Sequence, residues 1–237
     1  MEYQNITGPT KAQQEFIERE QMHKKKVAVW RMMLLVLLLA MWELCTRLGM
    51  IDAFIFSSPS RVLLCFWRMV RDKSIFGHIG ITLMETLVSF LIVTAAGTAA
   101  AVALWFSRSA SEILEPYLVM LNSLPKSALA PLLIVWLGAR QRTIIVAGMS
   151  VAIFGSILNL YTGFGEISQE KLKLIRTLGG GKKEELLKIV LPSSVPLILA
   201  NMKVNIGLCL VGVIIGEFIG ARQGLGYLII YGSQTFQ

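Results

Sequence analysis

The sequence predicts an all-α polytopic membrane protein, and two observations lead to this fold class. Of the 237 residues, 54% are hydrophobic and only 16% are charged, whereas about a quarter of the residues in a soluble domain are charged. Several apolar runs also approach the roughly 20 residues that a helix needs to cross a bilayer. These runs predict five spans, at residues 27–48, 79–106, 113–138, 143–161 and 195–218.

The charge and the cysteines argue against other classes of protein. The net charge of +8 does not indicate nucleic-acid binding, because basic residues beside apolar spans are typical of membrane proteins. Cys45, Cys65 and Cys209 are scattered, so we expect buried thiols rather than a disulfide framework or a metal site. His23 and His78 are too far apart in the sequence to suggest a metal site.

The N-terminal residues 1–26 are polar and end in three lysines, Lys24 to Lys26. A signal peptide also places a basic segment before an apolar run. Here the basic region is long, and no small-residue cleavage site follows Leu39. We therefore expect residues 1–26 to be a cytoplasmic tail, and residues 27–237 to be the transmembrane domain with its first span retained.

Residues 49–77 combine a turn signal with an amphipathic pattern. Ser58-Pro59-Ser60 favours a turn that leads into a helix, with Ser60 as the candidate N-cap. Apolar residues from Val62 to Val70 then recur on a face opposite arginines. This pattern suggests an interfacial helix on the outer side of the membrane, and an ordered loop is an equally good interpretation.

The second span, residues 79–106, contains small residues from Thr94 to Ala101. Small side chains allow helices to approach closely in lipid, so this stretch should pack against protein. Glu85 lies near the beginning of the span. A charged residue inside a span is costly and often functional, but we favour a position for Glu85 at the membrane interface.

The third segment, residues 113–138, is broken by Pro125 and Pro131. Prolines free backbone carbonyls that need partners in hydrocarbon, so this segment should lie inside a bundle or along a water-filled path. Polar side chains in three spans are candidates for lining such a path, where a cation would attract an anionic solute. Alternatively, Lys203 snorkels to the interface and Asn205 makes a helix contact. The pathway candidates are Asn122, Ser123, Lys126, Asn159, Asn201, Lys203 and Asn205.

A polar elbow, residues 163–194, separates the fourth and fifth spans. We expect two short amphipathic helices, joined at Gly179-Gly180-Gly181 and closed at Leu191-Pro192. The distribution of Lys and Arg among the loops favours a cytoplasmic elbow. An amphipathic elbow at a membrane surface is suited to bind another protein. The predicted apolar faces are Ile167, Leu174, Ile175 and Leu178 in the first helix, and Leu186, Leu187 and Val190 in the second.

The elbow resembles the cytoplasmic coupling motif of ABC importer permeases. That motif reads Glu-Ala-Ala, three residues, Gly, nine residues, Ile, one residue, Leu-Pro. Gly179, Ile189 and Leu191-Pro192 stand at this spacing, whereas Lys173-Leu174-Ile175 replaces Glu-Ala-Ala. Further stretches resemble the nitrate, aliphatic-sulfonate and taurine permeases: 42–44 with 47–49, 58–63, 124–132 with 136–138, and 216–220 with 224–228.

The resemblance, which covers about residues 27–237, implies a type I ABC importer permease bundle with six spans. Five are present here, and the sixth is missing at the C-terminus, because the segment from Tyr227 to Tyr231 is too short to span. We expect either a truncated chain or a permease that lacks one wall of its bundle.

The implied partners are two ABC ATPase subunits, a second permease copy in a homodimer, and an external solute-binding protein. The implied location is the bacterial plasma membrane, with the N-terminus cytoplasmic. This chain would bind no cofactor, since ATP and Mg belong to the ATPase, and Lys173 would pair with an acid of that partner. The implied ATPase-coupling residues are Lys173, Leu174, Ile175, Arg176, Thr177, Gly179, Ile189, Leu191 and Pro192.

Two other functions fit the sequence less well. An intramembrane enzyme needs paired acids or a histidine cluster at membrane depth, but Glu43, Glu85 and Glu217 are dispersed in the sequence. Gly179 to Lys183 also lacks the hydroxyl residue and the spacing of a phosphate-binding loop. A stand-alone channel leaves the elbow unexplained. The sequence therefore favours the membrane subunit of an ATP-driven importer of a small, anionic or organic solute.

Overall fold

The computed structural model describes residues 11–235, and these residues form helices and no strand. The chain divides into two compact units, of which the first ends at Arg71 and the second is Asp72–Thr235. Each unit is described by itself below. The predicted all-α fold is confirmed for the described residues.

The first unit consists of α1 (Lys11–Arg47), α2 (Ala53–Phe56) and α3 (Pro59–Arg71). The 37 residues of α1 include an apolar stretch long enough to cross a membrane. The helix begins well before Val27, so the three lysines 24–26 lie on the same helix as the apolar run.

The start of α3 differs from the prediction in its capping residue. Pro59 occupies the first turn, where its missing N–H costs nothing, and Ser58 rather than Ser60 accepts from the backbone, at 3.4 Å from Arg61 N. Glu43 of α1 caps the same turn, because its carboxylate accepts from Ser60 N at 3.1 Å and Ser60 Oγ at 3.0 Å. None of the residues of α3 is buried in the described structure. The segment is a helix rather than a loop, and its place at the membrane interface stays a prediction.

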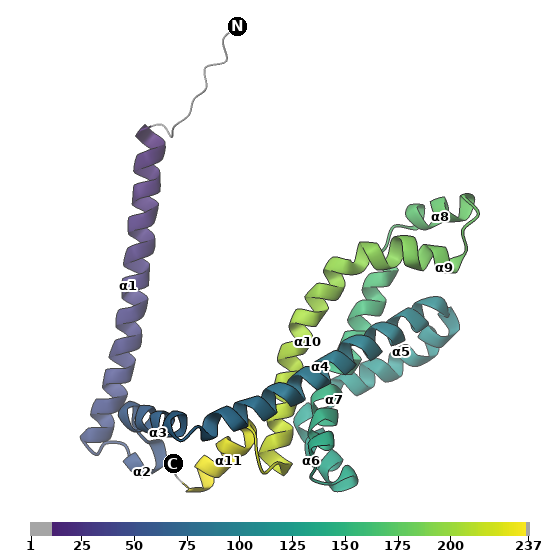
Figure 1. Cartoon of the computed structure of the whole chain (residues 1–237). Coiled ribbons are helices and arrows are strands. Elements are labelled where there is room, and N and C mark those ends of the chain that lie inside the picture. The colour runs from purple at the N-terminus through teal and green to yellow at the C-terminus, as the bar shows by residue number, and fades with distance from the viewer. Residues whose placement is uncertain (1–10, 236–237) are drawn as a thin grey trace. The chain divides into compact units, whose positions relative to one another are not determined.

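The second unit is built around α7 (Gln141–Gly165), which contacts α4 (Ser74–Phe106), α5 (Arg108–Ser123), α6 (Lys126–Leu137) and α10 (Leu191–Gly220). The remaining helices of the unit are α8 (Gln169–Thr177), α9 (Lys182–Glu185), a π-helical turn (Leu186–Val190) and α11 (Leu225–Thr235). Within this unit, α8 and α9 lie at one end, and α6 and α11 lie at the other (Figure 1).

The predicted break in the third segment is present at one proline only. Helices α5 and α6 meet at an angle of 94°, at Leu124 and Pro125. Pro131 lies inside α6, so the second predicted break does not occur. Pro131 is the sixth residue of α6, so it removes one hydrogen bond of the helix without ending it.

Small residues bring the long helices close together. On α4, Val93, Gly97 and Ala101 are buried at intervals of four residues, while Ala95 and Ala99 are exposed. The predicted small-residue stretch thus packs against protein along one face. At the contact between α7 and α10, a Cβ on Gly212 would lie 2.9 Å from Gly148 Cα, so the two backbones touch.

Four described helices are long and apolar enough to cross a membrane, and a fifth span results if the bent pair α5–α6 is taken as one. This number agrees with the five predicted spans. The prediction of buried thiols holds for Cys209, whereas Cys45 and Cys65 are half-buried.

Candidate functional site

The elbow turns on a glycine pair at the end of α8. Gly179 has φ of +82°, a left-handed conformation that glycine adopts without steric cost. Gly179 N donates to Arg176 O at 3.0 Å and Gly180 N donates to Ile175 O at 2.9 Å. These two bonds form a Schellman motif, which satisfies the last carbonyls of α8. Across the turn, Glu184 accepts from Gly181 N at 2.8 Å and caps α9.

One face of the elbow is fixed to the spans. Leu172, Leu186 and Val190 are buried in a core with Leu160 and Phe164 of α7. Leu186 and Val190 were predicted to share a face, and the structure places both inward. Leu172 is not among the predicted residues, although it lies within the same helix, two residues before Leu174.

Two polar contacts add to this anchorage. Arg176 of α8 donates through Nε and Nη2 to the buried carboxylate of Glu185, the second contact being 3.3 Å long. This hydrogen bond raises the pKa of the Arg176 guanidinium. Lys182 Nζ donates to Phe106 O, the end of α4, at 3.1 Å. The elbow is therefore tied to α4 as well as to α7.

The other face of the elbow is apolar and open. Leu174 and Leu178 are four residues apart and are 59% and 75% exposed, and Leu187 is 63% exposed. Ile175 is half-buried, so the predicted face of the first helix divides between core and surface. The other predicted coupling residues are Lys173, Thr177 and Pro192, which are exposed, and Ile189 and Leu191, which are half-buried.

The predicted closure of the elbow at Pro192 is wrong. The chain stays helical from Lys182 to Gly220, with the π-helical turn Leu186–Val190 immediately before the proline. A proline inside an α-helix removes one hydrogen bond and clashes with the carbonyl four residues earlier. Here Leu191 N donates to Leu186 O, five residues earlier, in the wider turn of a π-helix. The second helix of the elbow is thus continuous with the fifth predicted span.

Three of the predicted pathway residues meet at one serine of α7. Asn201 Nδ2 and Asn205 Nδ2 of α10 donate to Ser156 Oγ at 2.7 Å and 2.9 Å. Asn159 Nδ2 donates to Asn201 Oδ1 at 3.1 Å. Asn201 and Asn205 are 5% and 1% exposed, so in this chain they join two helices. Ser156 was missed because a lone serine in an apolar run carries little signal.

The other pathway candidates do not join this cluster. Asn122 lies beside Gly155, where an added Cβ would be 3.1 Å from Asn122 Oδ1. Ser123 Oγ donates to Met120 O within its own helix, at 2.7 Å. Lys126 is half-buried at the start of α6, and Lys203 is exposed on α10.

A second polar cluster lies at the opposite end of the unit from the elbow, around the start of α11 (Figure 1). Three successive backbone N–H groups point at side chains of α4 and α10. Gly224 N donates to His78 Nδ1 at 3.0 Å, Leu225 N to Thr82 Oγ1 at 2.8 Å, and Gly226 N to Glu217 Oε2 at 2.7 Å. The first donors of α11, which have no partner within a helix, are thereby satisfied.

This cluster corrects two interpretations of the sequence. Glu85 is 1% exposed inside the bundle rather than at an exposed interface. It lies beside Glu217, although the two are far apart in the sequence. His78 joins them through Gly224. The signal was the spacing of His78, Thr82 and Glu85, which places all three on one face of a helix. No group of three potential ligands for a metal ion is found among the described residues.

Comparison with known proteins gives one family and several relatives. Residues 92–237 match the family described as the binding-protein-dependent transport system inner membrane component. A probable ABC transporter permease of Haemophilus influenzae is 30% identical over 90% of this chain and 86% of its own length. The putative aliphatic sulfonates permease SsuC of Bacillus subtilis is 26% identical, with 87% and 75% covered. The taurine permease TauC of Escherichia coli is 22% identical, with 82% and 73% covered.

Proposed function

The chain belongs to the family of binding-protein-dependent transport system inner membrane components, the ABC importer permeases, and from this membership we propose that its elbow transmits the action of a partner ATPase to the spans. The protein is the transmembrane subunit of an importer and is not itself an enzyme. Nucleotide is bound by the ATPase of such a system. The observation that carries the proposal is an exposed apolar face on an elbow whose opposite face is anchored.

The exposed face is suited to a groove on another protein. Leu174 and Leu178 are the i and i+4 anchors of a short amphipathic helix, the arrangement used when helices bind grooves. Lys171 and Lys173 flank them and are exposed. A matching groove on the ATPase would have an apolar floor and an acidic rim. A groove that receives a glutamate at position 173 would have a basic rim instead.

The anchored face explains how movement would reach the membrane. A displacement of α8 acts on α9 through the Arg176–Glu185 ion pair, and α9 acts on α4 through Lys182 and Phe106 O. Because the helix continues without a break from Lys182 to Gly220, α10 moves with α9. Packed elements of this kind move as rigid bodies rather than bending continuously.

We propose a small organic solute, of the anionic sulfonate type, delivered by an external binding protein. Relatives named for aliphatic sulfonates and for taurine support this class. Relatives named for formylaminopyrimidine and riboflavin show that similar chains are associated with other solutes. Four pathway candidates lie outside the cluster around Ser156, and two of them, Asn122 and Lys126, lie near the bend between α5 and α6. A homodimer in the bacterial plasma membrane, with the N-terminus cytoplasmic, completes the proposal.

The test uses the permease co-expressed with its ATPase and reconstituted with loaded binding protein. Truncation of both Leu174 and Ile175 to alanine should abolish stimulation of ATP hydrolysis by the loaded binding protein. Gly179→Pro should do the same, because proline cannot adopt the φ of +82° found there. The control truncates Leu63 and Leu64, which are 68% and 51% exposed on α3, and should leave stimulation intact. Full stimulation in both elbow variants would refute the assignment.

A further inference from the structure

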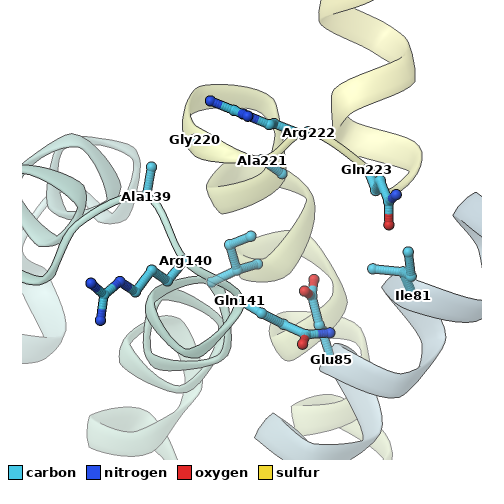
Figure 2. A pocket seen from close by; sticks show the side chains of 10 residues that line it. Ile81, Glu85, Ala139, Arg140, Gln141, Gly220, Ala221, Arg222 and Gln223 are labelled. Carbon is cyan, nitrogen blue, oxygen red and sulfur yellow. The ribbon is translucent and has the colours of Figure 1, made fainter.

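Two buried carboxyl groups lie side by side where α4 meets α10. Glu85 is 1% exposed and Glu217 is 0% exposed, and the two side chains are in direct electrostatic contact. Glu85 also lines a cavity of about 260 Å³, together with residues of the loops before α7 and after α10. Figure 2 shows the Glu85 carboxyl directed into this space, with the side chain of Gln141 beside it.

The two carboxyls differ in the donors that surround them. Glu217 Oε1 accepts from Thr82 Oγ1 at 2.6 Å, and Glu217 Oε2 accepts from Gly226 N at 2.7 Å. The second donor belongs to the first turn of α11, where the helix dipole favours negative charge. Both oxygens of Glu217 are thus held by short hydrogen bonds suited to a carboxylate. Glu217 is therefore the better hydrogen-bonded carboxyl of the pair.

Glu85 has no comparable support. Its Oε2 atom is buried and receives no hydrogen bond from the described residues. Two adjacent carboxylates cannot both remain charged in a low-dielectric interior unless a positive charge compensates one of them. Because Glu85 lines the cavity, such a charge has a route to its carboxyl group.

The protein's own cations do not supply this compensation. Arg140 and Arg222 line the cavity but are exposed, and Figure 2 shows their side chains extending away from the Glu85 carboxyl. His78 uses Nδ1 to accept from Gly224 N and stacks on Tyr227 of α11. Among the ion pairs of the described residues, none includes Glu85 or Glu217.

We propose that Glu85 and Glu217 form a binding site for one small, hard cation, a proton or a sodium ion, which enters through the cavity. A proton would bind Glu85 Oε2, and the resulting O–H would donate to the Glu217 carboxylate. A sodium ion would be held by the oxygen ligands that hard cations prefer, namely the carboxylates of Glu85 and Glu217. In either case the bound cation holds α4, α10 and the start of α11 together. The site does not depend on how the elbow works.

The test measures thermal unfolding of the full chain in lipid nanodiscs, followed by tryptophan fluorescence. Unfolding is compared between about pH 5 and about pH 9, a range that covers perturbed carboxyls, in choline chloride and in sodium chloride. If the ligand is a proton, the unfolding temperature falls at high pH by roughly 3 °C or more in both salts. If it is sodium, sodium chloride restores the unfolding temperature at high pH and choline chloride does not.

Two variants make the result specific. Glu85→Gln places a neutral hydrogen-bond donor at the site, and should remove both the pH dependence and the sodium dependence. Glu115→Gln, on the exposed face of α5, should behave as the wild type. Parallel pH curves for the wild type and Glu85→Gln, with no response to sodium in either, would overturn the proposal.

Infrared spectroscopy of the wild type provides an answer even if Glu85→Gln does not fold. A proton at the site gives the carbonyl band of a protonated carboxylic acid at neutral pH, and the band disappears at high pH. A sodium ion displaces that band when sodium chloride is added. A spectrum without a protonated-acid band at neutral pH, combined with no effect of sodium on unfolding, would contradict both forms of the proposal.

Discussion

Replacing Gly226 with alanine tests the packing of α11 on α10. Gly226 lies in the first turn of α11, and its N–H donates to Glu217 Oε2 at 2.7 Å. An added Cβ would overlap Ile214 O and lie 2.7 Å from Glu217 Cβ and 2.9 Å from Phe218 N. Two of these three atoms belong to the backbone of α10, which cannot move aside as a side chain can. We expect α11 to be displaced from α10 and the hydrogen bond to be lost.

The magnitude follows from two costs and one gain. Overpacking a closely packed contact costs about 1–3 kcal/mol, and losing a hydrogen bond to a charged group costs about 1.5–3 kcal/mol. Alanine returns up to about 1 kcal/mol through its higher helix propensity. The net loss of unfolding free energy is about 2–5 kcal/mol, which corresponds to a fall in unfolding temperature of roughly 5–15 °C for a chain of this size.

The assay is thermal unfolding in nanodiscs, with Gly207→Ala as the matched control. Gly207 lies on α10, and nothing is within 4 Å of a Cβ added there. Alanine at position 207 should therefore raise the unfolding temperature slightly, through propensity alone. If Gly226→Ala unfolds at the wild-type temperature, the described contact of α11 with α10 is wrong.

Three further predictions concern the elbow and the α7–α10 contact. Ser156→Ala leaves two buried amide donors without their acceptor, and should lower the unfolding free energy by about 1–3 kcal/mol per donor in chemical denaturation. The Ser150 hydroxyl bonds within its own helix, so Ser150→Ala should lower the unfolding free energy less. Arg176→Ala should lower the unfolding temperature more than Arg108→Ala, because Glu185, the partner of Arg176, is 2% exposed while Glu112, the partner of Arg108, is 63% exposed. Equal effects would show that burial of the partner is unimportant. Gly179→Ala should cost about 1 kcal/mol through its left-handed backbone and leave the complex coupled, so loss of ATPase stimulation in this mild variant would argue against our account of the turn.

The turn of the elbow could be predicted from the sequence because the signals for it are local. Glycine at 179 and the charge run around it specify a helix end without reference to the rest of the chain. Which face points outward could not be derived, since periodicity alone gives the stripe but not its partner. Leu174 and Leu178 share a stripe with Ile175, yet only Ile175 turns partly toward the spans. The continuation of the helix through Pro192 was missed because a π turn leaves no recognisable pattern in the sequence.

The buried clusters were harder to predict because they depend on contacts between distant segments. Glu85 and Glu217 are separated by most of the chain, and only the packing of α4 against α10 brings them together. Asn201 and Asn205 were identified as sharing a face, but their common acceptor, Ser156, lies in another span. In apolar helices a polar residue signals that it needs a partner, without indicating which one. Pairing such residues requires the fold.

The central claim, that the elbow is held by an ATPase, can be tested by photo-crosslinking in the assembled complex. A photoreactive amino acid replaces Leu178, which is 75% exposed on the elbow, or Val135, which is 88% exposed on α6 at the opposite end of the unit (Figure 1). We predict crosslinks to the ATPase subunit from position 178 and none from position 135. Absence of a crosslink at 178 in a complex that hydrolyses ATP in response to loaded binding protein would contradict the account.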